Sequence, residues 1–593
     1  MIALLQVFFH RLLPWRLWAV MGLGLLVVLP LTSCKKEDQQ IEKTTESTTL
    51  TEKPAPPLPD TLGGSFLISQ FAQRNEDPQT AYKHTQIVLA KGGYDAGILR
   101  YARFSALSAG NIQGALDNNA RLNPQDRDVS FYVLSFFQAY QNKNWDQAAG
   151  FLPPLAANGT YQSLEPLFRA WLAVARYSET QSPTPQQMDT ITAAFAQGAE
   201  GEMALLSQLQ RGYALAVLKK PHEALGVLRA SLGDLNTVPA TVLVTTAALM
   251  RQQNQPLDQG LFLRAGMDAD MTQTLLGMAK DGELPLMTNP LQGLFYLFQD
   301  LSSVFNRPGT QDHALMYAAL AQFMMPDHPF TTLNLGQILA DIGAPSQADA
   351  LYQRVPSTNP LFWLSTVYRA HLKIKDENNE DALNLIAPFY DRYRDNTAVK
   401  TLYADLLKSN LRFSEALPLY DDLIQGSKNA PQGRFYASRG ICYERLKQWD
   451  AAEKDLLKAI DLTPQDPLIL NYLAYSWIDR GVNLDRALAL LQKALALAPN
   501  NPEILDSLAW GYHKKGNHDK ALEGLQKAVT LAPDEPLILS HYGDVLWAAG
   551  KHRLATFAWD GALEMVRFIK KTTPQKALDV TEEDLVEKLS RNP

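Results

Sequence analysis

The residues of this 593-residue chain that could carry out chemistry do not combine into a catalytic motif. His222-Glu223 begins the spacing of a zinc-protease motif, but Gly226 stands where the second histidine is required. His513 and His518 are five positions apart, which favours a surface pair or a turn over a metal site. No glycine-rich phosphate loop is present either. We therefore expect a protein that is not an enzyme and that holds no metal or other cofactor.

The two cysteines, Cys34 and Cys442, are too few for a zinc site, and we expect no structural disulfide. Cys442 lies between Gly440 and Tyr443 inside an expected helix. A buried, inert thiol is therefore favoured over a nucleophile at this position.

Four copies of one pattern fill residues 433–567, and each copy is expected to form two helices joined by a turn. The third copy begins at Pro502 and the fourth at Pro536, so the period is 34 residues. Small residues recur where the two helices of a copy must approach each other. They are Gly440, Ala474, Ala509 and Gly543 in the first helices, and Ala452, Ala487, Ala521 and Ala555 in the second. Prolines end the second helices, because proline lacks the N–H that a continuing helix needs.

This pattern resembles the tetratricopeptide repeat. The resemblance implies an all-α solenoid, in which helical hairpins stack into a superhelix whose concave side is lined by the first helices. The phrases at 470–476, 506–510 and 541–547 also resemble long repeat proteins of Gram-negative bacteria, especially alphaproteobacteria. Most of those proteins have no assigned activity, so the resemblance implies a fold more than a function.

Weaker traces of the repeat reach back toward the start of the chain, as at Ala81, Ala115 and Ala148. Between 236 and 312 the prolines fall irregularly, which favours degenerate repeats, with a hinge as the alternative. We expect six segments. They are a signal peptide at 1–33, an acylated cysteine with a polar and proline-rich tether at 34–62, divergent repeats at 63–235, an irregular helical segment at 236–312, the C-terminal repeat array at 313–567, and a capping helix with a tail at 568–593.

The first 34 residues have the composition of a secretory signal. Arg11 and Arg16 precede the apolar run Leu17–Leu31, and the run ends in Leu-Thr-Ser-Cys at Cys34. This ending resembles the lipobox of bacterial lipoproteins, which implies that Cys34 is acylated and anchors the chain to a membrane. The alternative is an uncleaved transmembrane helix. In the lipoproteins that this ending resembles, Asp directly after the cysteine favours the inner membrane, so the resemblance implies that Lys35 directs the protein to the outer membrane, facing the periplasm.

Without a catalytic motif, the concave groove is the candidate functional surface. A net charge of −7 and the absence of a basic stripe argue against nucleic acid as a partner. The family resemblance places these residues in the groove: Asn471, Tyr475, Asp479, Asp506, Trp510, His513, Asp544 and Trp547. The aromatic residues are candidate binding anchors. Alternatively, Tyr475, Trp510 and Trp547 pack between adjacent first helices. The acidic residues favour a neutral or basic peptide or helix.

The sequence thus predicts a lipid-anchored periplasmic scaffold that binds proteins or peptides of envelope assembly, secretion or cell-wall machinery. Two alternatives remain open. One is an envelope hydrolase or transferase with a cryptic site in 236–312, where the titratable residues include no His or Cys. They are Asp258, Arg264, Asp268, Asp270, Lys280, Asp281 and Glu283. The other is a structural protein that self-associates through the ends of the solenoid.

Overall fold

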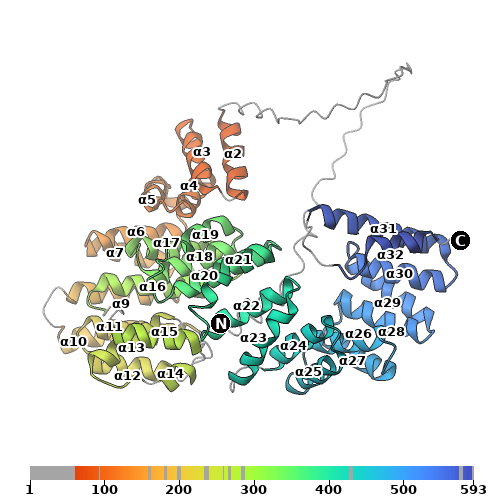
Figure 1. The fold of residues 1–593 in the computed structure, drawn as a ribbon. Helices are drawn as coiled ribbons and strands as arrows, with labels where there is room; N and C mark the ends of the chain where they lie inside the picture. The colour runs from red at the N-terminus through yellow and green to blue at the C-terminus, as the bar shows by residue number, and fades with distance from the viewer. Residues whose placement is uncertain are drawn as a thin grey trace, which may run out of the picture. The chain divides into compact units, whose positions relative to one another are not determined.

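The fold is taken from a computed structural model of the chain, shown in Figure 1. It describes residues 61–75, 77–92, 94–157, 162–178, 183–196, 202–232, 240–257, 259–264, 269–281, 287–426, 432–572 and 578–590. Within these ranges the regular structure is helical and no strand occurs, which confirms the all-α prediction. The backbone contacts divide the chain into two compact units, residues 1–362 (unit 1) and 363–593 (unit 2).

Unit 1 is built from short helices that follow one another along the chain. They are α2 (Leu62–Arg74), α3 (Pro78–Ala90), α4 (Ala96–Ser108), α5 (Ile112–Ala120), the 3-10 turn η1 (Pro124–Asp126), α6 (Val129–Gln141), α7 (Trp145–Gly150), α8 (Leu152–Ala156), α9 (Glu165–Ser178), α10 (Pro185–Ala196), α11 (Glu202–Val217), α12 (Pro221–Leu232), α13 (Ala240–Gln252), α14 (Gln259–Arg264), α15 (Ala269–Asp281), α16 (Pro290–Phe305), α17 (Gln311–Met324), α18 (Pro329–Asp341) and α19 (Pro345–Tyr352).

Unit 2 continues with helices of more even length. They are α20 (Phe362–Lys375), α21 (Asn379–Tyr390), α22 (Thr397–Ser409), α23 (Phe413–Gly426), α24 (Gly433–Arg445), α25 (Trp449–Leu462), α26 (Pro467–Asp479), α27 (Leu484–Leu497), α28 (Pro502–Lys514), α29 (His518–Leu531), α30 (Pro536–Ala548), α31 (His552–Thr572) and α32 (Glu582–Leu589).

Local chemistry sets the helix boundaries in unit 2. At the start of α28, the Asn501 side chain accepts a hydrogen bond from the backbone N–H of Ile504, and Pro502 takes the first helical position. At the turn after this helix, Gly516 adopts a φ of +78°, which glycine tolerates because it has no Cβ. Asp466 caps α26 in the same way, and Pro467 and Pro536 begin α26 and α30. A positive φ recurs at the corresponding turns, at Lys447, Gly481 and Gly550, so each copy turns from its first helix into its second.

The small residues of the repeat lie where the two helices of a hairpin touch, as the periodicity predicts. Ala509 and Ala521, for example, are both buried and belong to one core cluster. At Gly543 a Cβ atom would stand 2.4 Å from Cδ1 of Trp559, so no larger residue fits without a shift. Neighbouring first helices also meet, because α26 contacts α28 and α28 contacts α30. We call the side formed by α24, α26, α28 and α30 the first-helix face.

In unit 1, the hairpin of α16 and α17 packs against helices much earlier in the chain. Helix α16 contacts α9, α11 and α13, and α17 contacts α4 and α5. The ring of Phe298 lies 6.0 Å from that of Phe137 and 6.3 Å from that of Phe168. At Gly293 a Cβ atom would collide with Trp171, so α16 approaches α9 closely. The inward-facing side chains of these early helices are therefore covered by the chain itself.

One polar cluster lies in this contact. The carboxylate of Asp300 on α16 accepts hydrogen bonds from Gln210 Nε2 at 2.8 Å and from Thr241 Oγ1 at 2.6 Å. Burial raises the pKa of the Asp300 carboxyl to about 7, although the two hydrogen bonds act in the opposite direction. The segment 236–312, where degenerate repeats or a hinge were expected, thus contains a helix docked inside unit 1.

Candidate functional site

The eight residues that the sequence placed in a groove lie on three neighbouring first helices of unit 2. Helix α26 carries Asn471, Tyr475 and Asp479, α28 carries Asp506, Trp510 and His513, and α30 carries Asp544 and Trp547. Their exposure differs. Asp479 is exposed, Asp506 is buried, and the other six are half-buried. The structure therefore places them on three neighbouring first helices but does not offer all of them to solvent.

Trp510 connects two of these helices. Its ring stacks on that of His541 from α30, with centroids 4.1 Å apart and planes 9° apart. On its own helix it also stacks on His513, with centroids 4.9 Å apart. Trp510 Nε1 is buried and has no hydrogen-bond partner within the described residues. The ring thus packs between first helices, as the second of the two interpretations expected, and it remains only half-buried.

Asp506 and His541 form a buried pair beneath this stack. His541 Nδ1 lies 2.9 Å from Asp506 Oδ1, and the two side chains are 7% and 4% exposed. Tyr475 lies next to them, with its ring 6.3 Å from that of His541. Burial raises the pKa of the Tyr475 hydroxyl, and the nearby Asp506 adds to this effect. Asp506 is thus a structural residue and is not available as a charged contact.

Sequence reasoning missed His541. It directly follows the groove position held by Ser540, so the periodicity of the groove does not mark it. Its position in the sequence could have indicated the pair, because His541 follows Asp506 by one repeat of 34 residues plus one residue. That offset places a histidine beside a carboxylate on the next first helix.

His513 and His518 are close together at the end of this stack. Their Nδ1 atoms lie 3.2 Å apart, so at most one of the two nitrogens carries a proton. Burial lowers the pKa of His513, and the neighbouring His518 lowers it further. His513 is therefore neutral at neutral pH and can offer an aromatic face to a ligand.

The last first helix carries a second group of contacts. Trp547 stacks on His552, with centroids 4.2 Å apart, and lies 5.4 Å from Trp559. The Asp544 carboxylate accepts hydrogen bonds from Trp559 Nε1 at 3.1 Å and from Lys588 Nζ at 2.7 Å. Lys588 belongs to α32, so the C-terminal segment reaches the face where the candidate residues lie.

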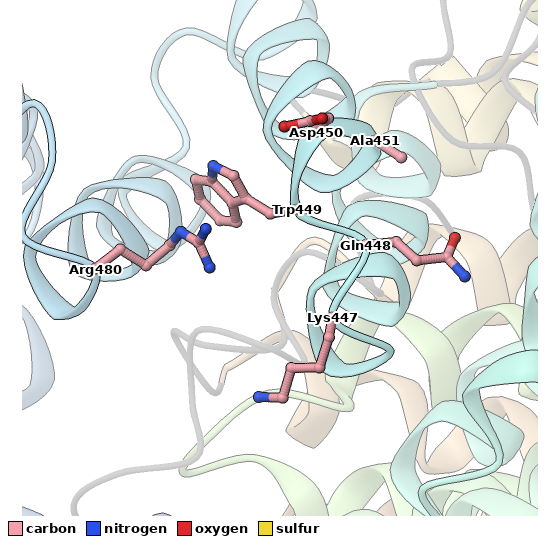
Figure 2. A pocket seen from close by; sticks show the side chains of 6 residues that line it. All are labelled: Lys447, Gln448, Trp449, Asp450, Ala451 and Arg480. Carbon is pink, nitrogen blue, oxygen red and sulfur yellow. The ribbon is translucent and has the colours of Figure 1, made fainter.

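A shallow hollow of about 410 Å³ lies at the edge of unit 2, near the turn between α24 and α25. It is lined by Lys447, Gln448, Trp449, Asp450, Ala451 and Arg480. The guanidinium of Arg480 sits 4.4 Å from the centroid of the Trp449 ring, while Lys447 and Gln448 point away from that ring (Figure 2). Because its polar groups do not converge on one point, the hollow offers no arrangement for acid–base or nucleophilic catalysis.

The remaining candidate groups for chemistry are a buried thiol, possible metal ligands and the titratable residues of 236–312. Cys442 is fully buried, and burial raises the pKa of its thiol to about 11, so the thiol is protonated at neutral pH. Across the described ranges, no group of three or more His, Cys, Asp and Glu side chains could hold a metal ion. Of the titratable residues in 236–312, Asp258, Asp268 and Glu283 lie outside the described residues.

The N-terminal predictions concern residues that the structure does not describe. Residues 1–60, with Cys34 among them, lie outside the described ranges. Among the helices that are described, none has both the length and the apolar composition needed to cross a bilayer.

A known family model matches part of the chain. Residues 368–567 match the family model described as tetratricopeptide repeat. A search of curated proteins found no match. Among solved structures, the chain is similar to a MamA fragment from Desulfovibrio magneticus RS-1, with 21% identity, a TM-score of 0.26, and coverage of 29% of this chain and 97% of that one.

Two further structures show lower sequence identity. The chain covers 96% of a chain of the APC/C hetero-tetramer Cut9-Hcn1, over 89% of its own length, at 13% identity and a TM-score of 0.38. It covers 97% of a tetratricopeptide repeat protein from Parabacteroides merdae, over 44% of its own length, at 17% identity and a TM-score of 0.36. At TM-scores this low, nothing about the function of this chain follows from the similarities.

The family match and the stacked hairpins agree over the same part of the chain. Residues 368–567 match the tetratricopeptide-repeat model, and the same residues form consecutive helical hairpins. Such repeats generally mediate contacts between proteins and typically have no catalytic role.

Proposed function

We propose that the chain is a non-enzymatic scaffold of the bacterial cell envelope that binds partner proteins through the first-helix face of unit 2. One observation carries the proposal. Three successive first helices carry the half-buried rings of Tyr475, Trp510 and Trp547, and the exposed carboxylate of Asp479 lies one turn after Tyr475 on α26. Half-buried aromatic rings that are already ordered lose little side-chain entropy on binding, which suits them as anchors.

The charge on this face suggests what kind of protein binds. Asp479 is exposed at the C-terminal end of α26, whereas Asp544 on α30 is half-buried and is paired with Lys588. Asp506 is already paired with His541 and adds no free charge. A neutral or basic segment of a partner therefore fits the face better than an acidic one. Proteins of envelope assembly, secretion or cell-wall machinery are the partner class that we propose.

The membrane anchor is a separate part of the proposal. The apolar run Leu17–Leu31 and the lipobox-like sequence that ends at Cys34 support acylation of this cysteine, with the array in the periplasm at the outer membrane. Replacing the thiol by Cys34→Ser removes the acylated atom. The variant should move from the membrane fraction to the soluble fraction of lysed cells, and a variant that stays in the membrane would contradict the anchor.

The binding face is tested by crosslinking in living cells followed by identification of the bound proteins. Trp510→Ala removes an anchor, and Asp479→Lys reverses the exposed charge. Each should reduce the yield of a specific crosslinked partner by at least about tenfold, the loss expected for a binding hot spot. Asp506 is unsuitable for this purpose, because it is buried and its replacement would disturb the fold.

Glu564→Lys is the matched control. Glu564 is exposed on the second helix α31, and no side-chain partner of it is found within the described residues. It makes the same charge reversal as Asp479→Lys but away from the first-helix face. If all three variants captured the same partners in the same yield, the first-helix face would not be the binding site.

A further inference from the structure

The C-terminal segment of the chain lies on the first-helix face. Residues 578–590 follow α31 and include α32, which packs against α31 beside α30 (Figure 1). Lys588 Nζ donates a hydrogen bond to Ser540 Oγ at 2.8 Å and pairs with Asp544 Oδ2 at 2.7 Å. Asp544 is one of the candidate groove residues, and Ser540 lies one helical turn before it on α30, so this segment covers part of the surface proposed for partners.

Apolar side chains hold the segment in place. Leu585 is fully buried, and Val580 is 5% exposed, in the same core cluster as Trp559 and Leu546. Leu578 and Leu589 pack against that cluster from its edge. Burial of these residues supplies the main attraction, because apolar area removed from water is the dominant favourable contribution to docking.

Charges fix the orientation of the segment. The ammonium of Lys588 is 19% exposed and the carboxylate of Asp544 is 18% exposed, so solvent screens this pair only in part. Toward the other end of the segment, Asp579 pairs with Arg445 of α24 at 3.0 Å. Both partners of that second pair are more exposed, so it contributes less. The segment thus runs from the first helix of one repeat to the first helix of another three repeats away.

We propose that residues 578–590 are a built-in competitor for the partner site, and that the partner docks a short amphipathic helix of the same chemistry. This inference rests on the proposed function of the first-helix face. The partner helix carries two apolar residues and, one turn after the second, a Lys or Arg that takes the place of Lys588 on Asp544 and Ser540. Because the competitor is tethered, it acts at an effective concentration on the order of millimolar, and a partner has to displace it.

The inference is tested with a labelled synthetic peptide of residues 578–590 and the purified full-length protein in detergent. Binding is measured by fluorescence anisotropy. In the wild-type protein the tethered segment occupies the site, so the peptide should bind weakly. In the variant Leu585→Ala/Lys588→Ala the tethered segment is weakened, and the peptide should bind at least about tenfold more tightly. Equal affinity for both proteins would overturn the proposal, as would the absence of binding to either at millimolar peptide.

Two controls separate competition from damage to the fold. Glu587→Ala changes an exposed neighbour on α32 for which no side-chain partner is found in the part of the chain that is described, so its peptide affinity should equal that of the wild type. The single variant Lys588→Ala keeps the buried Leu585, and should still bind the peptide more tightly than the wild type. If it did not, the Lys588 contact would have no part in the competition.

A charge test identifies the site on α30. In the variant Leu585→Ala/Lys588→Ala, a further change of Asp544→Asn removes the negative charge but leaves a side-chain oxygen that can accept the hydrogen bond from Trp559 Nε1. This change should lower the affinity for the wild-type peptide. It should not lower the affinity for a peptide in which Lys588 is replaced by Ala, because that peptide has already lost the contact. If the two changes lowered the affinity independently, the peptide's lysine would not contact Asp544, and the peptide would bind at another site.

The inference and the proposed function can fail separately. Peptide affinity is measured without any cellular partner, whereas the crosslinking experiment does not depend on the C-terminal segment. A protein that binds the peptide in competition but captures no partner in cells would contradict the proposed function alone. A protein that loses its partner on Trp510→Ala, yet binds the peptide equally with and without the released segment, would contradict the inference alone.

Discussion

Trp510 illustrates how one side chain can hold two helices together and still be available for binding. Its stacking on His541 ties α28 to α30, and its ring remains half-buried, so part of it can contact the proposed partner. Residues with this double role are rigid before binding, so a partner gains contact area without having to order them. Residue type and position suggest either role; the structure shows that the ring packs between first helices, whereas its role as a binding anchor belongs to the proposed function.

The pair of Asp506 and His541 should be the most sensitive point of this face. His541→Ala leaves the Asp506 carboxylate buried without its partner, which we expect to lower the stability of unit 2 by about 3 kcal/mol. Urea unfolding followed by circular dichroism measures the change.

The double variant Asp506→Ala/His541→Ala distinguishes this cause from a simple loss of packing. With no buried charge left over, it should be less destabilised than the sum of the two single variants. Strict additivity would mean that the two side chains do not interact.

At the scale of the helix, packing and not propensity decides where glycine is required. Gly543 and Gly561 both lie inside helices, but a Cβ at Gly543 would stand 2.4 Å from Trp559, whereas at Gly561 the nearest atom is Leu539 Cδ1 at 3.9 Å. We expect Gly543→Ala to destabilise unit 2 by about 1–3 kcal/mol. Gly561→Ala should stabilise it by up to about 1 kcal/mol, because alanine is the better helix former.

Thermal melting of the two variants checks this pair of opposite signs. Equal shifts for both variants would show that the contact between α30 and α31 does not depend on the missing Cβ.

The docking of α16 should depend on pH. The pKa of Asp300 rises on folding from the ordinary value near 4 to about 7, so the folded state binds the proton more tightly than the unfolded state. The contribution to stability is therefore complete below about pH 4 and is lost as the pH rises through 7. At about 1.4 kcal/mol for each pKa unit, the change is roughly 4 kcal/mol.

Hydrogen exchange of α16 at pH 5 and pH 8 measures this effect. Protection should be higher at pH 5, after correction for the intrinsic rate, and Asp300→Asn should remove the difference. An unchanged pH dependence in Asp300→Asn would assign the effect to another group.

The elements differ in how far the sequence predicts them. The hairpins of residues 433–567 follow from a period that repeats small residues at fixed positions, and the structure confirms them. The docking of α16 and the path of residues 578–590 could not be predicted in this way. Contacts such as Arg445 with Asp579 join residues 134 positions apart, and a pair that occurs once leaves no periodic signal.

On the scale of the whole molecule, the two units differ in the range of their contacts. Unit 2 is joined mainly by contacts between consecutive helices and between the first helices of neighbouring repeats, and the C-terminal segment adds contacts of longer range. Tandem repeats of this kind are stabilised by nearest-neighbour contacts. Residues 363–593 expressed alone should therefore fold, with a helical circular dichroism spectrum and the same melting transition that unit 2 shows in the full chain. An unfolded fragment would show that unit 2 depends on the rest of the chain.

Unit 1 has a different requirement, which follows from the hairpin of α16 and α17. Tyr140 donates a hydrogen bond to the carbonyl of Pro290, 150 residues later, and Gln210 reaches Asp300 over 90 residues. While the ribosome makes this protein, the early helices emerge long before the hairpin that covers their aromatic side chains. Because contacts between such distant residues form slowly, apolar surface of the early helices stays exposed until the hairpin docks. The first half of the chain, and not the regular repeats, should therefore be the part that most needs a chaperone.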